Sequence, residues 1–152
     1  MQLIIDNREP KEIISIIKAR IDNIELKNLE VGDFIINNNA GEPIMIFERK
    51  SIQDLISSIK DGRYNEQSYR LNECPLDNHN IYYIIEGNIM NFCNKQNETM
   101  QKMLFSSMLS LSYKKRFSIL HTNNTVETCE FIIRFYQKLI SENTNQTQNN
   151  KL

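Results

Sequence analysis

Apolar residues along this chain form short runs and helical stripes that alternate through most of its length. The runs at 2–6, 33–37 and 44–48 are short and rich in isoleucine, which is typical of buried strands. The segment between the last two runs, NNAGEP, has turn chemistry and predicts a hairpin. Three further strands are predicted at 24–29, 80–86 and 116–121.

Apolar residues spaced three or four positions apart predict the helices. Pro10 suits the first turn of one helix, and an isoleucine stripe follows it over 13–21. Ser51 and Asp54 have the spacing of a capping box for a second helix, which Gly62 can end. Three more helices are predicted at about 64–73, 97–113 and 125–141.

Strands and helices alternate after the hairpin, so the sequence predicts an α/β fold with a central mixed β-sheet flanked by helices. A chain of 152 residues suits one domain with one core. We assign residues 1–141 to that domain. The last segment, 142–152, is almost entirely polar and cannot bury itself, so we expect a disordered tail.

The net charge of −1 argues against a surface devoted throughout to nucleic acid, although a basic patch beside an acidic site would give the same sum. No apolar run approaches the roughly 20 residues of a membrane span, and the start, MQLIIDNREP, lacks the features of a secretory signal. Three cysteines without metal-like spacing suggest a reducing compartment. We therefore expect an intracellular protein, nuclear or cytoplasmic, that is not secreted and has no membrane partner.

The hairpin ends in a group of charges. If the hairpin is symmetric about its turn, Asp33 lies opposite Glu48 or the residue before it, so the two carboxylates are close in either register. Like charges at that distance repel, whereas a divalent cation between them would reverse the sign, and Mg²⁺ prefers carboxylate oxygens. Lys50 lies two residues beyond Glu48 and therefore on the same face, while Arg49 points away.

Two carboxylates and an ammonium group on one face can hold a metal, orient a water molecule and neutralise charge on a phosphorane-like transition state. Asp6 and Glu9 follow the first strand and would add acidity if that strand neighbours the hairpin. A simpler interpretation also fits each feature. The run at 48–50 would then be a solvated strand end, Asp33 a turn residue and Asp54 only a helix cap.

Six short motifs follow one another between Gly32 and Leu71. They are GD (32–33), ERK (48–50), DL (54–55), DGR (61–63), EQ (66–67) and RL (70–71). With DNRE (6–9) and YIIEG (83–87), they resemble the nuclease domain of the XPF family, which comprises structure-selective DNA endonucleases of repair and recombination. The run from ERK to RL is most similar to the branch that cuts replication forks and 3′ flaps.

This resemblance implies a restriction-endonuclease-like fold and hydrolysis of phosphodiesters with Mg²⁺ or Mn²⁺. The positions that match Asp33 and Glu48 bind metal in the family, and the one that matches Lys50 supports catalysis. The matches to Asp6, Glu9 and Arg49 shape the catalytic site.

The resemblance also implies a branched DNA partner, such as a 3′ flap, a fork or a four-way junction. Arg8, Arg63 and Gln67 are the candidates for DNA contacts, although Arg63 is equally well explained by a structural salt bridge. The helix–hairpin–helix DNA-binding motifs that usually follow this domain are not visible, so we expect a minimal nuclease or an excised domain.

Family members dimerise, so the resemblance implies a homodimer, or a heterodimer with a related nuclease-fold subunit, through the C-terminal helices. The helices predicted at 97–113 and 125–141 both carry apolar residues on more than one side, which leaves a spare surface of the kind that marks an interface. The alternative is that each helix has one stripe and that both stripes are buried in the domain core.

Two rival functions remain open. The chain could be a non-catalytic nuclease-fold subunit that serves as a dimerisation or DNA-binding scaffold, but such degenerate subunits lose the motif carboxylates or the lysine. Asp33, Glu48 and Lys50 are all present here, which favours catalysis. It could also be a nuclease of the same broad fold with another substrate, such as a Holliday-junction resolvase or a restriction enzyme, but the DGR, EQ and RL motifs argue against this.

Overall fold

The computed structural model describes the backbone of residues 1–150 and the side chains of residues 1–143. Six strands form one sheet in the order β2-β1-β3-β4-β5-β6. Strand β3 pairs antiparallel with β1 and with β4, and the other neighbours are parallel, which confirms the predicted mixed sheet. The strands are β1 Gln2–Asp6, β2 Ile24–Lys27, β3 Phe34–Asn37, β4 Pro43–Ser51, β5 Ile81–Glu86 and β6 Ser118–Thr122.

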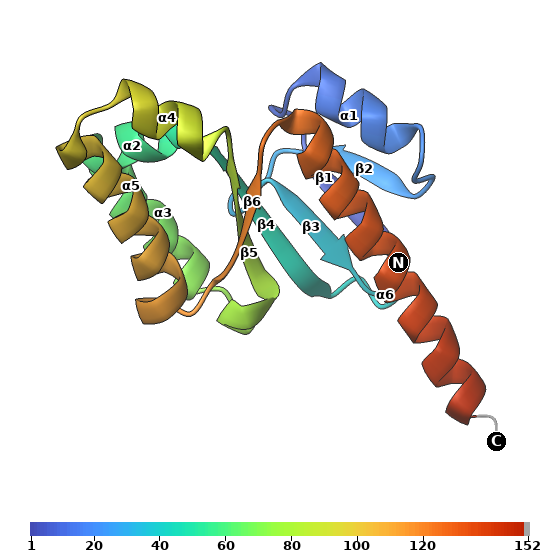
Figure 1. The fold of residues 1–152 in the computed structure, drawn as a ribbon. Helices are drawn as coiled ribbons and strands as arrows, with labels where there is room; N and C mark the ends of the chain where they lie inside the picture. Colours follow the sequence, from blue (N-terminus) through green and yellow to red (C-terminus); the bar gives the residue numbers. More distant parts are fainter. Residues whose placement is uncertain (151–152) are drawn as a thin grey trace.

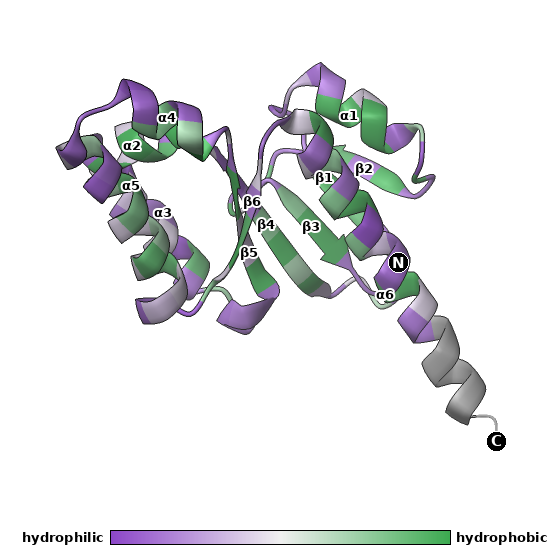
Figure 2. Ribbon diagram, viewed as in Figure 1, coloured by the Kyte–Doolittle hydropathy of each residue, from purple (hydrophilic) through white to green (hydrophobic). Residues whose placement is uncertain are grey.

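Helices cover both faces of the sheet (Figure 1). Helices α1 and α6 pack on one face, and α2 to α5 pack on the other, so there are two apolar layers. Figure 2 shows the apolar residues along the central strands and on the helix surfaces that face them. The helices are α1 Lys11–Lys18, α2 Ile52–Asp61, α3 Arg63–Asn72, α4 Ile89–Lys95, α5 Glu98–Leu109 and α6 Thr125–Asn150.

The β3–β4 hairpin has the predicted register near its open end. Phe34 pairs with Phe47, and the backbone N–H of Asp33 donates to the Phe47 carbonyl at 2.8 Å. Gly32 makes this close approach possible, because it adopts φ +77° and an added Cβ would lie 2.6 Å from Cγ2 of Ile46. The GD motif is therefore the backbone device that brings a carboxylate to the end of the hairpin.

The caps of α2 are as the sequence predicts. The hydroxyl of Ser51 accepts a hydrogen bond from the backbone N–H of Asp54 at 3.1 Å. Gly62, at φ +86°, ends α2 in the left-handed conformation and is at once the cap of α3. The motifs on α2 and α3 thus lie on two helices with a fixed turn between them.

Several elements differ from the predicted ones. Strand β4 extends to Ser51 because β5 pairs with it up to Glu86. Helix α4 was not predicted, since it has only seven residues and depends on the cap that Asn88 supplies to the N–H of Asn91. A five-residue π-helical turn, η2 (Ser110–Lys114), follows α5.

Helix α6 continues to Asn150, past its predicted end at 141. The predicted tail is therefore helical up to Asn150, and its last two residues lie outside the described part of the chain. The division of the chain at 141 stays a prediction. Among the described residues, no helix combines the length and apolarity of a membrane-spanning segment.

Candidate active site

A groove lies where the hairpin, the loop after β2 and α3 meet. It collects six of the nine residues that sequence reasoning assigned to the site: Arg8, Asp33, Glu48, Arg49, Lys50 and Gln67. Its other lining residues are Leu29, Glu30, Val31, Gly32, Arg70 and Leu71. The remaining three predicted residues, Asp6, Glu9 and Arg63, do not line this groove.

Asp33, Glu48 and Lys50 converge in the groove. Asp33 Oδ2 accepts a hydrogen bond from the backbone N–H of Arg49 at 2.7 Å, which fixes its carboxylate across the hairpin. Lys50 Nζ lies 3.8 Å from Glu48 Oε1, so both side chains are on one face of β4. The predicted grouping of two carboxylates and one ammonium group is therefore present.

Two carboxyl groups, those of Asp33 and Glu48, share this point of the groove with one ammonium group. Burial raises the pKa of Glu48 to about 8, with a further contribution from the negative charge of Asp33 and opposition from Lys50. Burial also raises the pKa of Asp33, while the Arg49 N–H and the Lys50 charge act to lower it. Because two neighbouring acids both resist ionisation, the groove favours an added cation.

Tyr83 is a member of this cluster that sequence reasoning missed. It pairs with Glu48 in the parallel register of β4 and β5, and its side chain is buried in the apolar layer beneath α2 to α5. Its hydroxyl has no hydrogen-bond partner among the described residues. Burial and the charge of Glu48 raise the pKa of Tyr83, so the group is a neutral donor that lacks an acceptor.

These residues fit a divalent metal of the magnesium type. Among the described residues, no three His, Cys, Asp or Glu side chains form a closed metal-binding group. Mg²⁺ does not need one, because it keeps several water molecules and is usually held by one or two carboxylates together with substrate phosphates. Asp33 and Glu48, which both line the groove, would supply the carboxylates.

The other face of β4 carries a closed ionic network around Arg49. Its guanidinium donates to both carboxylate oxygens of Glu86, at 2.9 and 3.0 Å, and to Glu9 at 3.0 Å. Glu86 also accepts a 2.7 Å hydrogen bond from the hydroxyl of Thr128 on α6. Sequence reasoning missed Glu86, although its place at the end of β5, next to the end of β4, was a usable signal.

Glu9 therefore joins the Arg49 network and not the carboxylate pair in the groove. Burial raises its pKa to about 7, as does the negative charge of Asp33, while Arg49 acts to lower it. Asp6 is also held elsewhere. The guanidinium of Arg8 donates hydrogen bonds of 2.9 and 2.7 Å to the carboxylate of Asp6. This pairing is the main cause of the pKa of Asp6 being lowered to about 2.

Of the three residues predicted to contact DNA, two line the groove and one does not. Gln67 on α3 lines the groove, and so does Arg8. Arg63 forms a 2.7 Å ion pair with Asp61 on the surface, which is the structural alternative that the sequence left open. Arg70 lines the groove and was missed, although the RL motif contains it and it follows Gln67 by one helical turn.

Comparison with known proteins identifies the family of this chain. The family profile described as the ERCC4 domain matches residues 5–135. The chain belongs to the ERCC4 domain family. This result confirms the resemblance to the XPF nucleases at the level of the family.

Two of the proteins similar to this ERCC4 domain are named as crossover junction endonucleases. The probable crossover junction endonuclease mus81 of Dictyostelium discoideum is 38% identical over 144 residues, which are 88% of this chain and 15% of that protein. Crossover junction endonuclease MUS81 of Debaryomyces hansenii is 32% identical over 131 residues, which are 76% of this chain and 20% of that protein. The chain thus spans a fifth or less of the length of these relatives.

A solved structure confirms the fold. XPF from Aeropyrum pernix superposes with a TM-score of 0.71 at 23% identity, covering 88% of this chain and 59% of that one. A second structure of the same protein, in complex with DNA, gives the same TM-score and covers 93% of this chain. The predicted restriction-endonuclease-like fold is therefore correct.

Proposed function

We propose that the chain is the nuclease domain of a structure-specific endonuclease that hydrolyses phosphodiesters in branched DNA during repair or recombination. The observation that carries the proposal is the convergence of Asp33, Glu48 and Lys50 in one groove, with two carboxylates whose pKa values are raised. Relatives named as crossover junction endonucleases, and a similar fold solved with DNA, support it. Such an enzyme acts on intracellular DNA, in the nucleus or the cytoplasm.

We infer that Mg²⁺ or Mn²⁺ is the cofactor and that Asp33 and Glu48 hold it. When bound, the metal would supply a Lewis acid and lower the pKa of a water molecule. Lys50 provides the ammonium group on the same face, where it neutralises charge that develops on the phosphate oxygens. Arg49 stays on the opposite face and holds the end of β4 in place through Glu9 and Glu86.

Metal binding and cleavage test this function together. The parent, Asp33→Asn and Glu48→Gln should be titrated with Mn²⁺ by calorimetry and incubated with labelled flap, fork and four-way DNA in Mg²⁺. We expect binding and cleavage by the parent and the loss of both in each variant. Equal metal binding by all three proteins would overturn the assignment of the ligands.

The scaffold alternative makes a different prediction in the same assay. A non-catalytic subunit would bind branched DNA but would not cut it under any metal condition. The presence of Asp33, Glu48 and Lys50 favours the enzyme. If the parent does not cut, fusion of a helix–hairpin–helix module separates a missing DNA-binding domain, which restores cleavage, from a true scaffold, which stays inactive.

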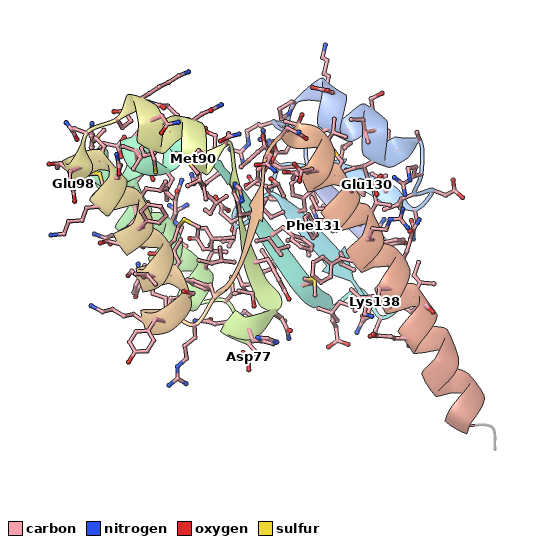
Figure 3. All side chains as sticks on the ribbon, in the orientation of Figure 1. Asp77, Met90, Glu98, Glu130, Phe131 and Lys138 are labelled. Atoms are coloured by element: carbon pink, nitrogen blue, oxygen red, sulfur yellow. The ribbon has the colours of Figure 1, made fainter. Side chains whose placement is uncertain are left out.

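We also infer a dimer, with β6 at its centre. This strand is the outer strand of the sheet, and α5 and α6 flank it from opposite faces (Figure 1). Met90 on α4 and Phe131 on α6 lie on either side of it (Figure 3), and Leu109 on α5 is exposed as well. An outer strand between exposed apolar residues is a surface that favours a partner, either a second copy or a related subunit.

Light scattering tests the dimer. At micromolar concentration the parent should show about twice the chain mass, and Leu109→Glu should show the mass of one chain. Leu26→Glu, at the opposite edge of the sheet, is the matched control and should remain dimeric. A monomeric parent over a wide concentration range would exclude the homodimer and leave only the heterodimer with a related subunit.

A further inference from the structure

A second groove lies against α3, on the side away from the proposed active site. Eight residues line it, and three of them are the consecutive cations Lys114, Lys115 and Arg116. No carboxylate is among the lining residues in the described part of the chain. Because the whole chain has slightly more acidic than basic residues, 19 against 18, this is a local concentration of positive charge.

Lys115 fastens this basic turn to α3. Its Nζ donates a 2.6 Å hydrogen bond to Ser68 Oγ and lies 4.4 Å from the ring centroid of Tyr64, a cation–π distance. Asn78 Nδ2 donates to the Lys115 carbonyl at 2.8 Å, which fixes the backbone as well. The position of the turn is therefore set by the fold and does not require a ligand.

Lys114 and Arg116 are the cations that this anchor leaves exposed. Arg116 has φ +63°, a left-handed conformation that is uncommon for an arginine and that persists only where the surroundings hold it. Phe117 holds it here, because its ring is buried and its N–H donates to the Leu111 carbonyl at 3.0 Å. Tyr69, which is 65% exposed, adds an aromatic surface to the same groove.

Helix α3 connects this groove with the active site. Gln67 and Arg70 line the active-site groove, whereas Ser68 and Asn72 line the second groove, and at 100° per residue these pairs lie on opposite sides of the helix. A helix with its side chains is about 10–12 Å wide. For a duplex that crosses α3 from one groove to the other, this width corresponds to about three or four base pairs, since one strand advances about 3.4 Å per base pair.

We propose that Lys114 and Arg116, with Tyr69, form a second DNA-binding site that holds the phosphate backbone of a duplex arm next to the cleavage point. The proposal rests on the proposed nuclease function for the identity of its ligand. Its function is to position the substrate, because the two cations are separated from Asp33, Glu48 and Lys50 by the width of α3. Contacts to phosphate carry no sequence information, as suits an enzyme that recognises the shape of DNA.

Binding of fluorescein-labelled fork DNA in EDTA, measured by anisotropy from 50 to 300 mM salt, tests the site without cleavage. The double variant Lys114→Gln/Arg116→Gln should bind about five- to tenfold more weakly at 100 mM salt, and the slope of log K against log salt should be shallower by about 1.8, or about 0.9 for each phosphate contact. In cleavage assays with Mg²⁺, the weaker binding of the double variant should appear as a higher KM. The matched control, Lys11→Gln/Lys18→Gln on α1, removes the same charge from the other face of the sheet and should match the parent.

Shortening the duplex arms one at a time gives an independent test. When the arm that crosses α3 is cut to fewer than about four base pairs, the parent should lose the advantage that it has over the double variant. A double variant with the salt slope of the parent would overturn the second site while leaving the nuclease function intact. A parent that binds DNA through this turn but cuts it neither alone nor with the fused helix–hairpin–helix module would overturn the nuclease function alone, and a parent that binds no DNA would overturn both.

Discussion

The two faces of β4 use similar residues in opposite ways. On one face, Arg49 is paired with Glu9 and Glu86 at 2.9–3.0 Å, so each charge has a partner at hydrogen-bonding distance. On the other face, the ion pair that Glu48 forms among the described residues is with Lys50 at 3.8 Å, which is longer than the 2.7–2.9 Å of a strong charge-assisted bond. The charges of the first face are paired at hydrogen-bonding distance within the protein, and the carboxylate of Glu48 is not.

This difference separates stability from chemistry within one strand. A closed network of buried charges fixes geometry, and breaking it leaves an uncompensated charge in the core. An open cluster of acids whose pKa values are raised costs free energy in the free protein and provides a site for a cation. Successive side chains of a strand point to opposite faces of the sheet. Glu48 and Lys50 can therefore belong to the cluster of acids while Arg49, between them, belongs to the closed network.

Arg49→Ala should give the largest effect, because it leaves Glu9 and Glu86 buried without their cation. We expect the free energy of unfolding to fall by about 3–5 kcal/mol at pH 7, measured by urea denaturation. Arg134→Ala is the matched control. It removes an exposed arginine paired with Glu130 and should change stability by less than about 0.5 kcal/mol. Equal losses of stability in the two variants would show that the Arg49 network stabilises the fold no more than an exposed ion pair does.

Lys50→Ala should affect activity and spare the fold. The cleavage rate on flap DNA should fall by roughly 10²–10³-fold, the scale seen when one transition-state donor is removed. The stability should change by no more than about 1 kcal/mol, because the ion pair with Glu48 is long. Cleavage at the parental rate would show that Lys50 takes no part in the cleavage step.

Glu48→Gln should change how stability depends on pH. The folded pKa of Glu48, about 8, is above the ordinary value of 4.5, so its contribution is fully present below pH 4.5 and is lost as pH rises towards 8. Glutamine does not titrate. In EDTA the variant should therefore match the parent near pH 4.5 and exceed its free energy of unfolding by about 1–3 kcal/mol at pH 8.5.

Metal provides the control for this pH effect. Mn²⁺ at ten times its Kd should stabilise the parent by about 1.4 kcal/mol and should leave Glu48→Gln unchanged. If the free energies of unfolding of parent and variant in EDTA depend on pH in the same way, the pKa of Glu48 is not raised in the folded protein.

Tyr83→Phe should give the smallest effect, and it tests the face of β4 that carries Glu48 and Lys50. Its hydroxyl has no partner among the described residues, so its loss should change the free energy of unfolding by less than about 0.5 kcal/mol or should stabilise the protein. Cleavage should slow by about three- to tenfold if the hydroxyl binds a water molecule of the site. Tyr82→Phe, on the other face of β5, is the control and should cut normally.

The hairpin shows how far sequence reasoning could go at the site. Local rules were enough to bring Asp33 beside Glu48 and to place Lys50 on the same face, because antiparallel register and strand alternation follow from adjacent residues. They could not place Glu9. It was expected to add acidity near Asp33, and its charge does help to raise the pKa of Glu48, but its ion pair is with Arg49 on the opposite face.

Glu86 and Tyr83 were missed for a related reason. Both lie on β5, and their relation to the site depends on the parallel pairing of β5 with β4, which joins segments more than thirty residues apart. A parallel connection has no turn to set its register, so the pairing is decided when the helices between the strands pack on the sheet. The basic turn after α5 likewise gained an anchor, Ser68, that no local pattern indicates.

The sequence by itself determined most of the elements, the caps of α2, the hairpin and the charged motif at its end, because these follow from spacing over a few residues. It did not determine that α5 and α6 lie on opposite faces of the sheet, that Arg49 closes its network through Thr128 of α6, or that α3 separates two grooves. Those features depend on burial and charge shared between distant segments. Only the tertiary structure decided which acids were paired and which were left for a ligand, since the free energy of a buried charge depends on what surrounds it.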